Sequence, residues 1–290
     1  MAARPLSNTS IAIVGGGIGG LCLAAGLTKL PHLDVRIYEG VAAYSDVGAG
    51  LALHPNAIRA MELIGPEVKR AYFSKAIVSA DEEEQEMGTQ VILAAGPHSG
   101  EIVAELGRAK GRKTVARADL LDGLRELIPR ERIQFGKRLA KIEEVGEGVV
   151  LTFTDTSTAS ADCLIGADGV HSATRAYLLG HDHSATKPVN HDGWHMDRRM
   201  VPMEEAKQAV DERWTKDVPI LCGPGAYLNS MPLHYGKTLS IAVVRKGAST
   251  GGRTPPLRIE AFDAYNEDAR MLVEVYCSVT FQVINTPSIV

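Results

Sequence analysis

The stretch IAIVGGGIGGLCLAAGL, residues 11–27, decides the fold of this chain. It opens on four apolar residues, as is typical of a short strand that is buried on both faces. Clustered glycines follow, and residues 21–30 then read as an apolar helix. Residues 35–38 read as a second short strand, which is followed directly by Glu39. Strand, glycine turn, helix and strand are the parts of a βαβ unit, so the sequence predicts an α/β fold.

Three glycines in this turn have the spacing Gly15-x-Gly17-x-x-Gly20, which is that of a dinucleotide-binding loop. The first glycine permits a sharp turn, the second lets the backbone approach a pyrophosphate, and the third lets the helix pack against the strand. The N-terminus of the helix adds free N–H groups and a positive dipole end. Glu39 stands where a carboxylate accepts hydrogen bonds from a ribose, with an ordinary exposed glutamate as the alternative. The stretch therefore predicts binding of FAD or NAD.

Composition excludes several other classes of protein. The chain has 290 residues, of which 31 are basic and 35 are acidic, for a net charge of −4. A nucleic-acid partner is not expected, because there is no excess of cations to neutralise phosphates. No membrane span is expected, because the apolar stretch at residues 11–27 is too short and is interrupted by six glycines. The four cysteines form no Cys-x-x-Cys pair, which predicts reduced thiols and a cytoplasmic protein.

Three further motifs follow the glycine turn in order. Residues 47–56 read VGAGLALHPN, residues 116–120 read ARADL, and residues 164–175 read LIGADGVHSATR. Together with residues 15–21 and Glu39, they resemble the ordered motifs of the FAD-dependent aromatic hydroxylases. This group of single-component flavoprotein monooxygenases includes salicylate hydroxylases and fungal enzymes of aromatic polyketide metabolism. The resemblance extends over about residues 8–270 and is far more specific than one glycine loop.

The resemblance implies FAD and NAD(P)H as cofactors. It places Gly50 near the flavin, Arg117 at the FAD diphosphate, and the Asp168–Gly169 turn against both FAD and the nicotinamide donor. A surface arginine and a plain Asp-Gly turn are the alternatives for these positions. The cofactor-binding residues that it implies are Gly15, Gly17, Ile18, Gly20, Glu39, Gly50, Arg117, Asp168 and Gly169.

The family also implies a domain organisation, namely a Rossmann-like FAD-binding domain with an inserted antiparallel β-sheet that covers the substrate. We expect the FAD/NAD(P)-binding domain at residues 6–75 and 112–180, and the substrate-covering sheet at residues 76–111 and 181–262. Residues 263–290 would form a helix and an atypical tail. Alternating patterns predict antiparallel strands at residues 226–233 and 239–245. Residues 77–79 and 89–93 are expected to form a hairpin, and residues 257–274 a helix.

Arg198 is the candidate catalytic residue. The stretch DRRMVP, residues 197–202, matches a strand that carries an active-site arginine in the related fungal dearomatising hydroxylases. A guanidinium there would hold a phenolate and favour its ionised form. A surface ion pair is the alternative. In that subgroup a tyrosine precedes the proline of the next strand, whereas this chain has Met231 there.

Other kinds of site find little support in the sequence. Histidines at 181, 183, 191 and 195 have no familiar metal-binding spacing, so a solvated loop is expected and no metal site is predicted. There is no Gly-x-Ser-x-Gly motif, so a serine hydrolase is not expected.

The C-terminal region departs from the family. The family has a later Gly-Asp motif whose aspartate binds the flavin, and no Gly-Asp dipeptide occurs in this sequence. A truncated sequence and a genuine short form both remain open.

From the family resemblance we expect a FAD-dependent monooxygenase that hydroxylates a phenolic or polyketide-derived aromatic with NAD(P)H and O₂, in secondary metabolism or aromatic catabolism. The alternatives are another FAD oxidoreductase of the same fold and a non-catalytic remnant.

Overall fold

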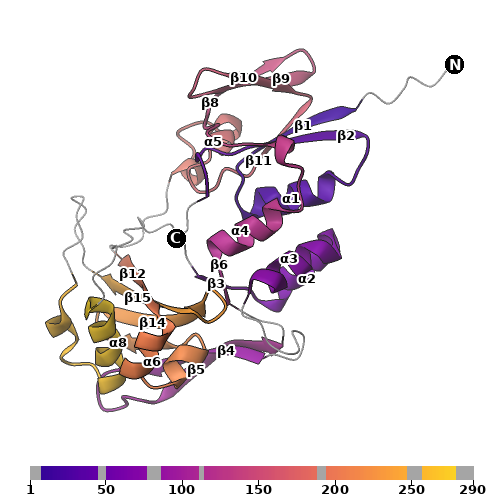
Figure 1. Cartoon of the computed structure of the whole chain (residues 1–290). Coiled ribbons are helices and arrows are strands. Elements are labelled where there is room, and N and C mark those ends of the chain that lie inside the picture. Colours follow the sequence, from indigo (N-terminus) through magenta and orange to yellow (C-terminus); the bar gives the residue numbers. More distant parts are fainter. Residues whose placement is uncertain are drawn as a thin grey trace. The chain divides into compact units, whose positions relative to one another are not determined.

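A computed structural model describes most of the chain, and Figure 1 shows its helices and strands in sequence colours. The described residues are 8–44, 50–76, 86–110, 114–187, 194–246 and 257–278. The chain divides into two compact units. The first unit comprises residues 1–46, 59–72 and 118–188, and the second comprises residues 47–58, 73–117 and 189–290. Helices and sheets occur together, which confirms the predicted α/β class.

The first unit is built on a parallel sheet. Its strands lie in the order β11 (Cys163–Gly166), β1 (Thr9–Val14), β2 (Leu33–Tyr38) and β7 (Ile133–Gln134). Helix α1 (Ile18–Leu27) connects β1 to β2 and packs against both. This is the βαβ unit that the sequence predicts.

A small antiparallel sheet covers one face of the parallel sheet. Its strands are β8 (Leu139–Val145), β9 (Gly148–Phe153) and β10 (Thr158–Ala161), in the order β10-β9-β8. Ala12, Val14 and Tyr38 pack with Leu151 and Phe153 between the two sheets. The Tyr38 and Phe153 rings lie 4.9 Å apart. Short side chains on β1 therefore bring the two layers close together.

Further helices precede β12 (Trp194–Pro202) in the sequence. They are α2 (Pro55–Ile64), α3 (Pro66–Lys75), α4 (Arg117–Arg125), η1 (Arg130–Arg132), α5 (Ala173–Leu179) and η2 (Ser184–Thr186). Within the described residues, no helix is long and apolar enough to cross a membrane.

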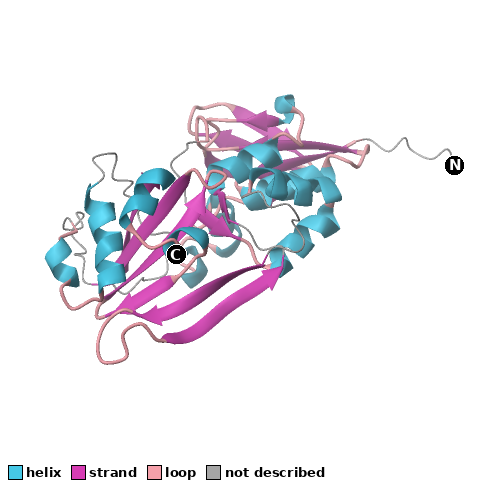
Figure 2. Ribbon diagram, turned by 60° about the horizontal axis from the view of Figure 1, so that its bottom comes forward, coloured by secondary structure: helices cyan, strands magenta, loops and turns pink. Residues whose placement is uncertain are grey.

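The second unit is built on a six-stranded sheet, whose long strands are drawn in Figure 2. The strands run in the order β12 (Trp194–Pro202), β15 (Thr238–Lys246), β14 (Ala226–Leu233), β13 (Ile220–Gly223), β4 (Glu86–Leu93) and β5 (Ile102–Lys110). All neighbours are antiparallel except β13 and β4. A separate strand pair joins β3 (Gly50–Ala52) to β6 (Thr114–Ala116).

Helices pack on one face of the six-stranded sheet. They are α6 (Met203–Ala209), α7 (Arg213–Lys216) and α8 (Glu267–Ser278), together with the short helix η3 (Ile259–Phe262). Val201, Leu228 and Ile241 of the sheet share a buried core with Leu272 and Val273 of α8. Because side chains alternate along a strand, the residues between these core positions point to the opposite face.

We call that opposite surface the Arg198 face. It is formed by alternate residues of three neighbouring strands, namely Met196, Arg198 and Met200 of β12, Ser240, Ala242 and Val244 of β15, and Tyr227, Asn229 and Met231 of β14.

Two secondary-structure predictions need correction. Residues 257–274 do not form one helix, because the helical conformation is interrupted between η3 and α8. Tyr265 pairs with Ala95 in an isolated bridge, and the Asn266 side chain accepts a hydrogen bond from the Ala269 N–H at 3.1 Å. Pairing with a distant residue and a new helix cap therefore override the local helical pattern.

The predicted hairpin partner of residues 89–93 was also placed too early in the chain. Residues 77–79 lie outside the described residues, and β4 pairs instead with β5. Sequence reasoning missed β5 because its apolar residues do not alternate cleanly and Gly107 interrupts them. The strands predicted at residues 226–233 and 239–245 are confirmed as β14 and β15.

Candidate functional site

The glycine turn after β1 depends on close approaches of backbone. Gly15 has φ +104°, a region that side chains disfavour, and a Cβ there would collide with the carbonyl of Ala167. The Gly15 N–H donates to the Tyr38 carbonyl at 2.9 Å, and the Ala167 N–H donates to the Val14 carbonyl at 2.7 Å. Strands β2 and β11 therefore clamp the turn from both sides, and only glycine fits between them.

Gly20 and Gly17 differ in what surrounds them. A Cβ on Gly20 would collide with the Gly15 carbonyl, so the packing of α1 against the turn requires glycine. A Cβ on Gly17 would have no atom of the described chain within 4 Å. Gly17 is the N-cap of α1, and Ile18 begins the helix, whose first N–H groups have no partner within the helix. The space in front of Gly17 thus suits an approaching phosphate.

Glu39 is held in place by backbone N–H groups. One carboxylate oxygen accepts from the Gly16 N–H at 2.6 Å, and the other accepts from the Val41 N–H at 2.9 Å. The backbone N–H of Glu39 donates to the Gln134 carbonyl at 2.8 Å. A carboxylate offers about four acceptor positions, so both oxygens keep acceptor capacity for hydroxyl groups of a ligand.

Gly16 and Tyr44 are residues of this site that sequence reasoning missed. The Tyr44 hydroxyl donates to the Gly16 carbonyl at 2.5 Å, and the Tyr44 ring packs edge-on against Phe135 at 5.1 Å. A Cβ on Gly16 would lie 2.7 Å from the Tyr44 hydroxyl and 3.1 Å from Glu39. The fingerprint treats position 16 as variable, so no pattern in the sequence indicated this contact.

Asp168 organises the loop between β11 and α5. Its carboxylate accepts from the hydroxyl groups of Ser172 and Thr174, each at 2.6 Å, and from the Thr174 N–H at 3.0 Å. Burial raises the pKa of Asp168, but the hydrogen bonds from Ser172 and Thr174 outweigh it and leave the pKa below its ordinary value. The carboxylate is therefore ionised and accepts three hydrogen bonds from its own loop.

The rest of this loop is fixed by Arg175. Its guanidinium donates to the carbonyls of Gly169 at 3.1 Å and Val170 at 2.6 Å. Gly169 has φ +75° and makes the sharp turn that follows Asp168. The Asp168 backbone lies beside Gly15, so the structure brings the predicted residues of the first unit together around one turn.

Gly50 and Arg117 belong to the second unit and lie at one strand pair. Gly50 of β3 pairs with Ala116 of β6, directly before Arg117, whose side chain is exposed at the start of α4. A Cβ on Gly50 would collide with Met231 and Leu233 of β14. The pair β3–β6 therefore packs against the end of β14.

Arg198 is a half-buried cation that has no ionic partner among the residues that the structure describes. Its guanidinium lies 3.2 Å from the Met196 sulfur, and its buried Nε has no hydrogen-bond partner in the described part of the chain. Within the described residues no carboxylate forms an ion pair with Arg198, which disfavours the surface ion pair considered above. Burial lowers the pKa of Arg198. An isolated buried charge is costly, so this position favours an anionic ligand.

The two neighbours of Arg198 in the sequence behave differently. Asp197 forms an ion pair with Arg245 at 3.0 Å, and the Arg199 guanidinium lies 4.7 Å from the centre of the Tyr276 ring. Both point toward the helix side of the sheet. Arg198 alone of the three belongs to the Arg198 face.

A family model described as an FAD binding domain matches residues 8–197 of the sequence. The chain belongs to this family of FAD-binding domains. The match includes the glycine turn, Glu39, Asp168 and the start of β12, so it spans residues of both units.

Curated relatives are fungal and bacterial monooxygenases. The 6-methylsalicylate 1-monooxygenase atA of Aspergillus terreus is 41% identical over 244 residues, which cover 82% of this chain and 54% of that protein. A salicylate hydroxylase of Pseudomonas putida is 30% identical over 282 residues, which cover 91% of this chain and 64% of that protein. The chain thus spans about half to two-thirds of the length of these relatives.

Solved structures agree with the fold. A salicylate hydroxylase in complex with substrate is 26% identical with a TM-score of 0.71, and the match covers 93% of this chain and 66% of that one. The Rossmann-like architecture expected for an FAD-binding domain is therefore confirmed. FAD is the cofactor of this family, and the unfilled space at Gly17 and the remaining acceptor capacity of Glu39 fit it.

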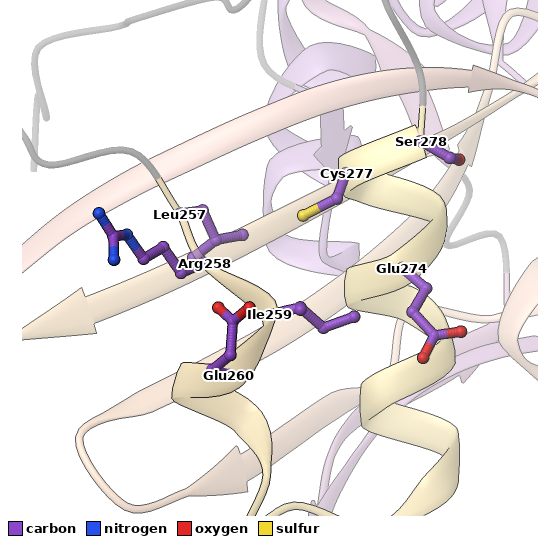
Figure 3. Close-up of a pocket in the computed structure, with 7 residues that line it drawn as sticks. All are labelled: Leu257, Arg258, Ile259, Glu260, Glu274, Cys277 and Ser278. Carbon is purple, nitrogen blue, oxygen red and sulfur yellow. The ribbon is translucent and has the colours of Figure 1, made fainter.

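A separate recess lies between η3 and α8 in the second unit. Figure 3 shows its lining, which consists of Leu257, Arg258, Ile259, Glu260, Glu274, Cys277 and Ser278. None of the predicted site residues lines this recess. Within the described residues, no group of three or more His, Cys, Asp or Glu side chains is arranged to hold a metal ion.

Proposed function

We propose that this protein is an FAD-dependent monooxygenase that hydroxylates a phenolic or polyketide-derived aromatic with NAD(P)H and O₂. Arg198 carries the proposal, because it is a half-buried cation with no ionic partner in the described chain. It lies on a face with Met196, Tyr227 and Met231, where an aromatic ring finds apolar contacts and its acidic group finds a positive charge.

The residues of the glycine turn in the first unit would hold the cofactor. Gly15 and Gly20 shape the turn, while Gly17 and Ile18 present the helix N-terminus to the phosphates. Glu39 would accept hydrogen bonds from the ribose hydroxyls. We assign the remaining contacts to Gly50, Arg117, Asp168 and Gly169, as the family motifs imply.

The protein's own part in the chemistry is to position the substrate and to favour its ionised form. When bound, FAD supplies the redox chemistry that links NAD(P)H to O₂. The Arg198 guanidinium would bind the phenolate or carboxylate of the substrate and lower the pKa of a phenol by favouring its ionised form. The ionised ring is richer in electrons, which favours attack on an electrophilic oxygen.

The relatives support this class of reaction, since they include a 6-methylsalicylate monooxygenase and salicylate hydroxylases. Their substrates are small aromatic acids by name, so we infer a small-molecule substrate in secondary metabolism or aromatic catabolism. All four cysteines are free in the structure, in keeping with the reducing cytoplasm that we propose as its location.

The test starts with the visible spectrum of the purified protein, with and without added FAD, after gel filtration. Flavin-containing protein is then supplied with NAD(P)H, aromatic acids and isotopically labelled O₂. Label in a hydroxylated product is the expected result. Oxidation of NAD(P)H and substrate without label in the product would identify a different FAD oxidoreductase. A chain that binds no flavin would contradict the proposal.

A further inference from the structure

Strand register places one unassigned polar residue in line with Arg198. Arg198 of β12 pairs with Ala242 of β15, and Ala242 pairs on its other side with Asn229 of β14. The three residues therefore form one row across the Arg198 face. Neighbouring strands are about 4.8 Å apart, so the Cα atoms of Arg198 and Asn229 are separated by about 10 Å.

Small side chains separate the two polar groups. Ala242 contributes only a methyl group between them, and it is 1% exposed. A larger residue there would stand between the guanidinium and the amide. The methyl group therefore places no long side chain between the guanidinium and the amide, which can both reach a ligand at their outer ends.

The rows on both sides of this one are mostly apolar or aromatic, with Ser240 as the exception. Met196, Val244 and Tyr227 form the next row, and the Tyr227 ring lies 6.2 Å from that of Trp194. Met200, Ser240 and Met231 form the row on the other side. An aromatic ring over the row would thus have apolar contacts along its edges and polar groups at its two ends.

Asn229 has the features of a residue that binds a ligand. It is half-buried near the middle of a six-stranded sheet, and its side-chain amide makes no hydrogen bond within the described residues. Its neighbour Ser230, on the helix face, donates to the Trp214 carbonyl at 2.6 Å. A half-buried amide loses part of its hydration, so a partner supplied by a ligand is favourable.

We propose that Asn229 is a specificity-determining residue that hydrogen-bonds a second polar substituent of the substrate whose acidic group is bound by Arg198. The substrate class is a ring that carries an acidic group and a separate hydroxyl or carbonyl group. This inference rests on the proposed function, because it takes an aromatic acid as the ligand of Arg198.

The test compares benzoate with its three hydroxy isomers in wild-type protein and in Asn229→Leu. Tryptophan fluorescence reports binding, since Trp194 borders the face, and it does not require flavin. The substitution removes the amide at similar size. We expect it to weaken the binding of the best-bound hydroxybenzoate about 10-fold, while the affinity for benzoate stays within about twofold of wild type. Gln208→Leu, which removes an exposed amide from α6, is the matched control.

A second variant tests the proximity of Asn229 to Arg198. Asn229→Asp places a carboxylate in the row, where it competes for the guanidinium and repels anions, so binding of every aromatic acid should weaken at least 10-fold. Thermal denaturation confirms that both variants fold.

The inference fails if Asn229→Leu binds hydroxybenzoates as tightly as wild type does. It also fails if the substitution weakens the binding of benzoate as much as the binding of hydroxybenzoates. It also fails if wild-type protein binds none of these acids. Absence of flavin binding, by contrast, contradicts only the proposed monooxygenase activity, because the fluorescence titration is independent of the cofactor.

Discussion

The glycine turn of the first unit and the Arg198 face of the second differ in how their polar groups are satisfied. Around the turn, Glu39 accepts from two backbone N–H groups, and Asp168 accepts from two hydroxyl groups and one N–H. On the Arg198 face, Arg198 has only a sulfur contact and the Asn229 side chain has no hydrogen bond within the described residues.

This difference indicates two ways of building a binding surface. The turn is organised by the chain itself, so its shape is present before any ligand arrives and favours one kind of cofactor. The Arg198 face leaves polar groups for a ligand to satisfy, so its selectivity depends on the ligand's own substituents. Substitutions at turn positions that are packed against the chain should therefore affect both folding and cofactor binding, whereas substitutions on the Arg198 face should affect ligand binding alone.

The largest effect is expected from Gly15→Ala. The new methyl group would collide with the Ala167 carbonyl at a φ that side chains disfavour, which should cost at least about 3 kcal/mol of stability and abolish FAD binding. Urea denaturation and flavin titration measure the two losses. Gly17→Ala is the matched variant, since its methyl group would have no atom of the described residues within 4 Å. It should fold normally and yet weaken FAD binding, and normal FAD binding would place the phosphates elsewhere.

Arg198→Met should weaken the binding of aromatic acids about 100-fold, and it should leave the melting temperature of the protein unchanged or raise it. The reason is that the substitution removes a half-buried charge that has no partner in the described chain. Titration with aromatic acids and thermal denaturation test both statements. Arg199→Met is the contrasting variant, because it loses the contact with the Tyr276 ring and should lower the melting temperature without changing affinity. A destabilised Arg198→Met would show that this arginine has a structural role.

Asp168→Asn should lower stability by about 1–3 kcal/mol at pH 7, because the ionised carboxylate accepts three hydrogen bonds. Hydrogen bonding holds the pKa of Asp168 below its ordinary value, so its stabilisation is complete above the unfolded pKa of about 3.9. It is lost as pH falls through the lower folded pKa. Urea denaturation should show that the difference in unfolding free energy between Asp168→Asn and wild type becomes smaller below about pH 4.

A gap that does not change with pH would mean that the charge of Asp168 contributes nothing to the loop. Asp182→Asn removes an exposed carboxylate from the same unit and controls for the change in net charge.

The smallest effect is expected from Tyr44→Phe, which removes the hydroxyl that donates to the Gly16 carbonyl. Loss of one such hydrogen bond should weaken FAD binding about fivefold, since Gly16 also orients Glu39. Flavin fluorescence titration is the measurement. Tyr177→Phe, which loses a surface hydrogen bond to Glu144, should leave FAD affinity as in wild type. Equal effects of the two variants would argue against a special role for Tyr44.

Sequence alone determined the parts of this protein that depend on local pattern. The apolar run before Gly15, the spacing to Gly20 and the position of Glu39 predicted the βαβ unit and the dinucleotide class. Four ordered motifs predicted the FAD-binding family. The alternating strands at residues 226–233 and 239–245 were also predicted, because period-two alternation over several residues is a strong local signal.

Tertiary structure alone decided which distant residues meet. The contact of Gly16 with Glu39 and Tyr44 spans more than twenty residues, and no spacing rule encodes it. The break between η3 and α8 follows from the pairing of Tyr265 with Ala95. Asn229 and Arg198 share a row only because β15 pairs with both β12 and β14 in one particular register. Register is set by the packing of a whole sheet face, and a shift of one residue would turn Asn229 toward the helices.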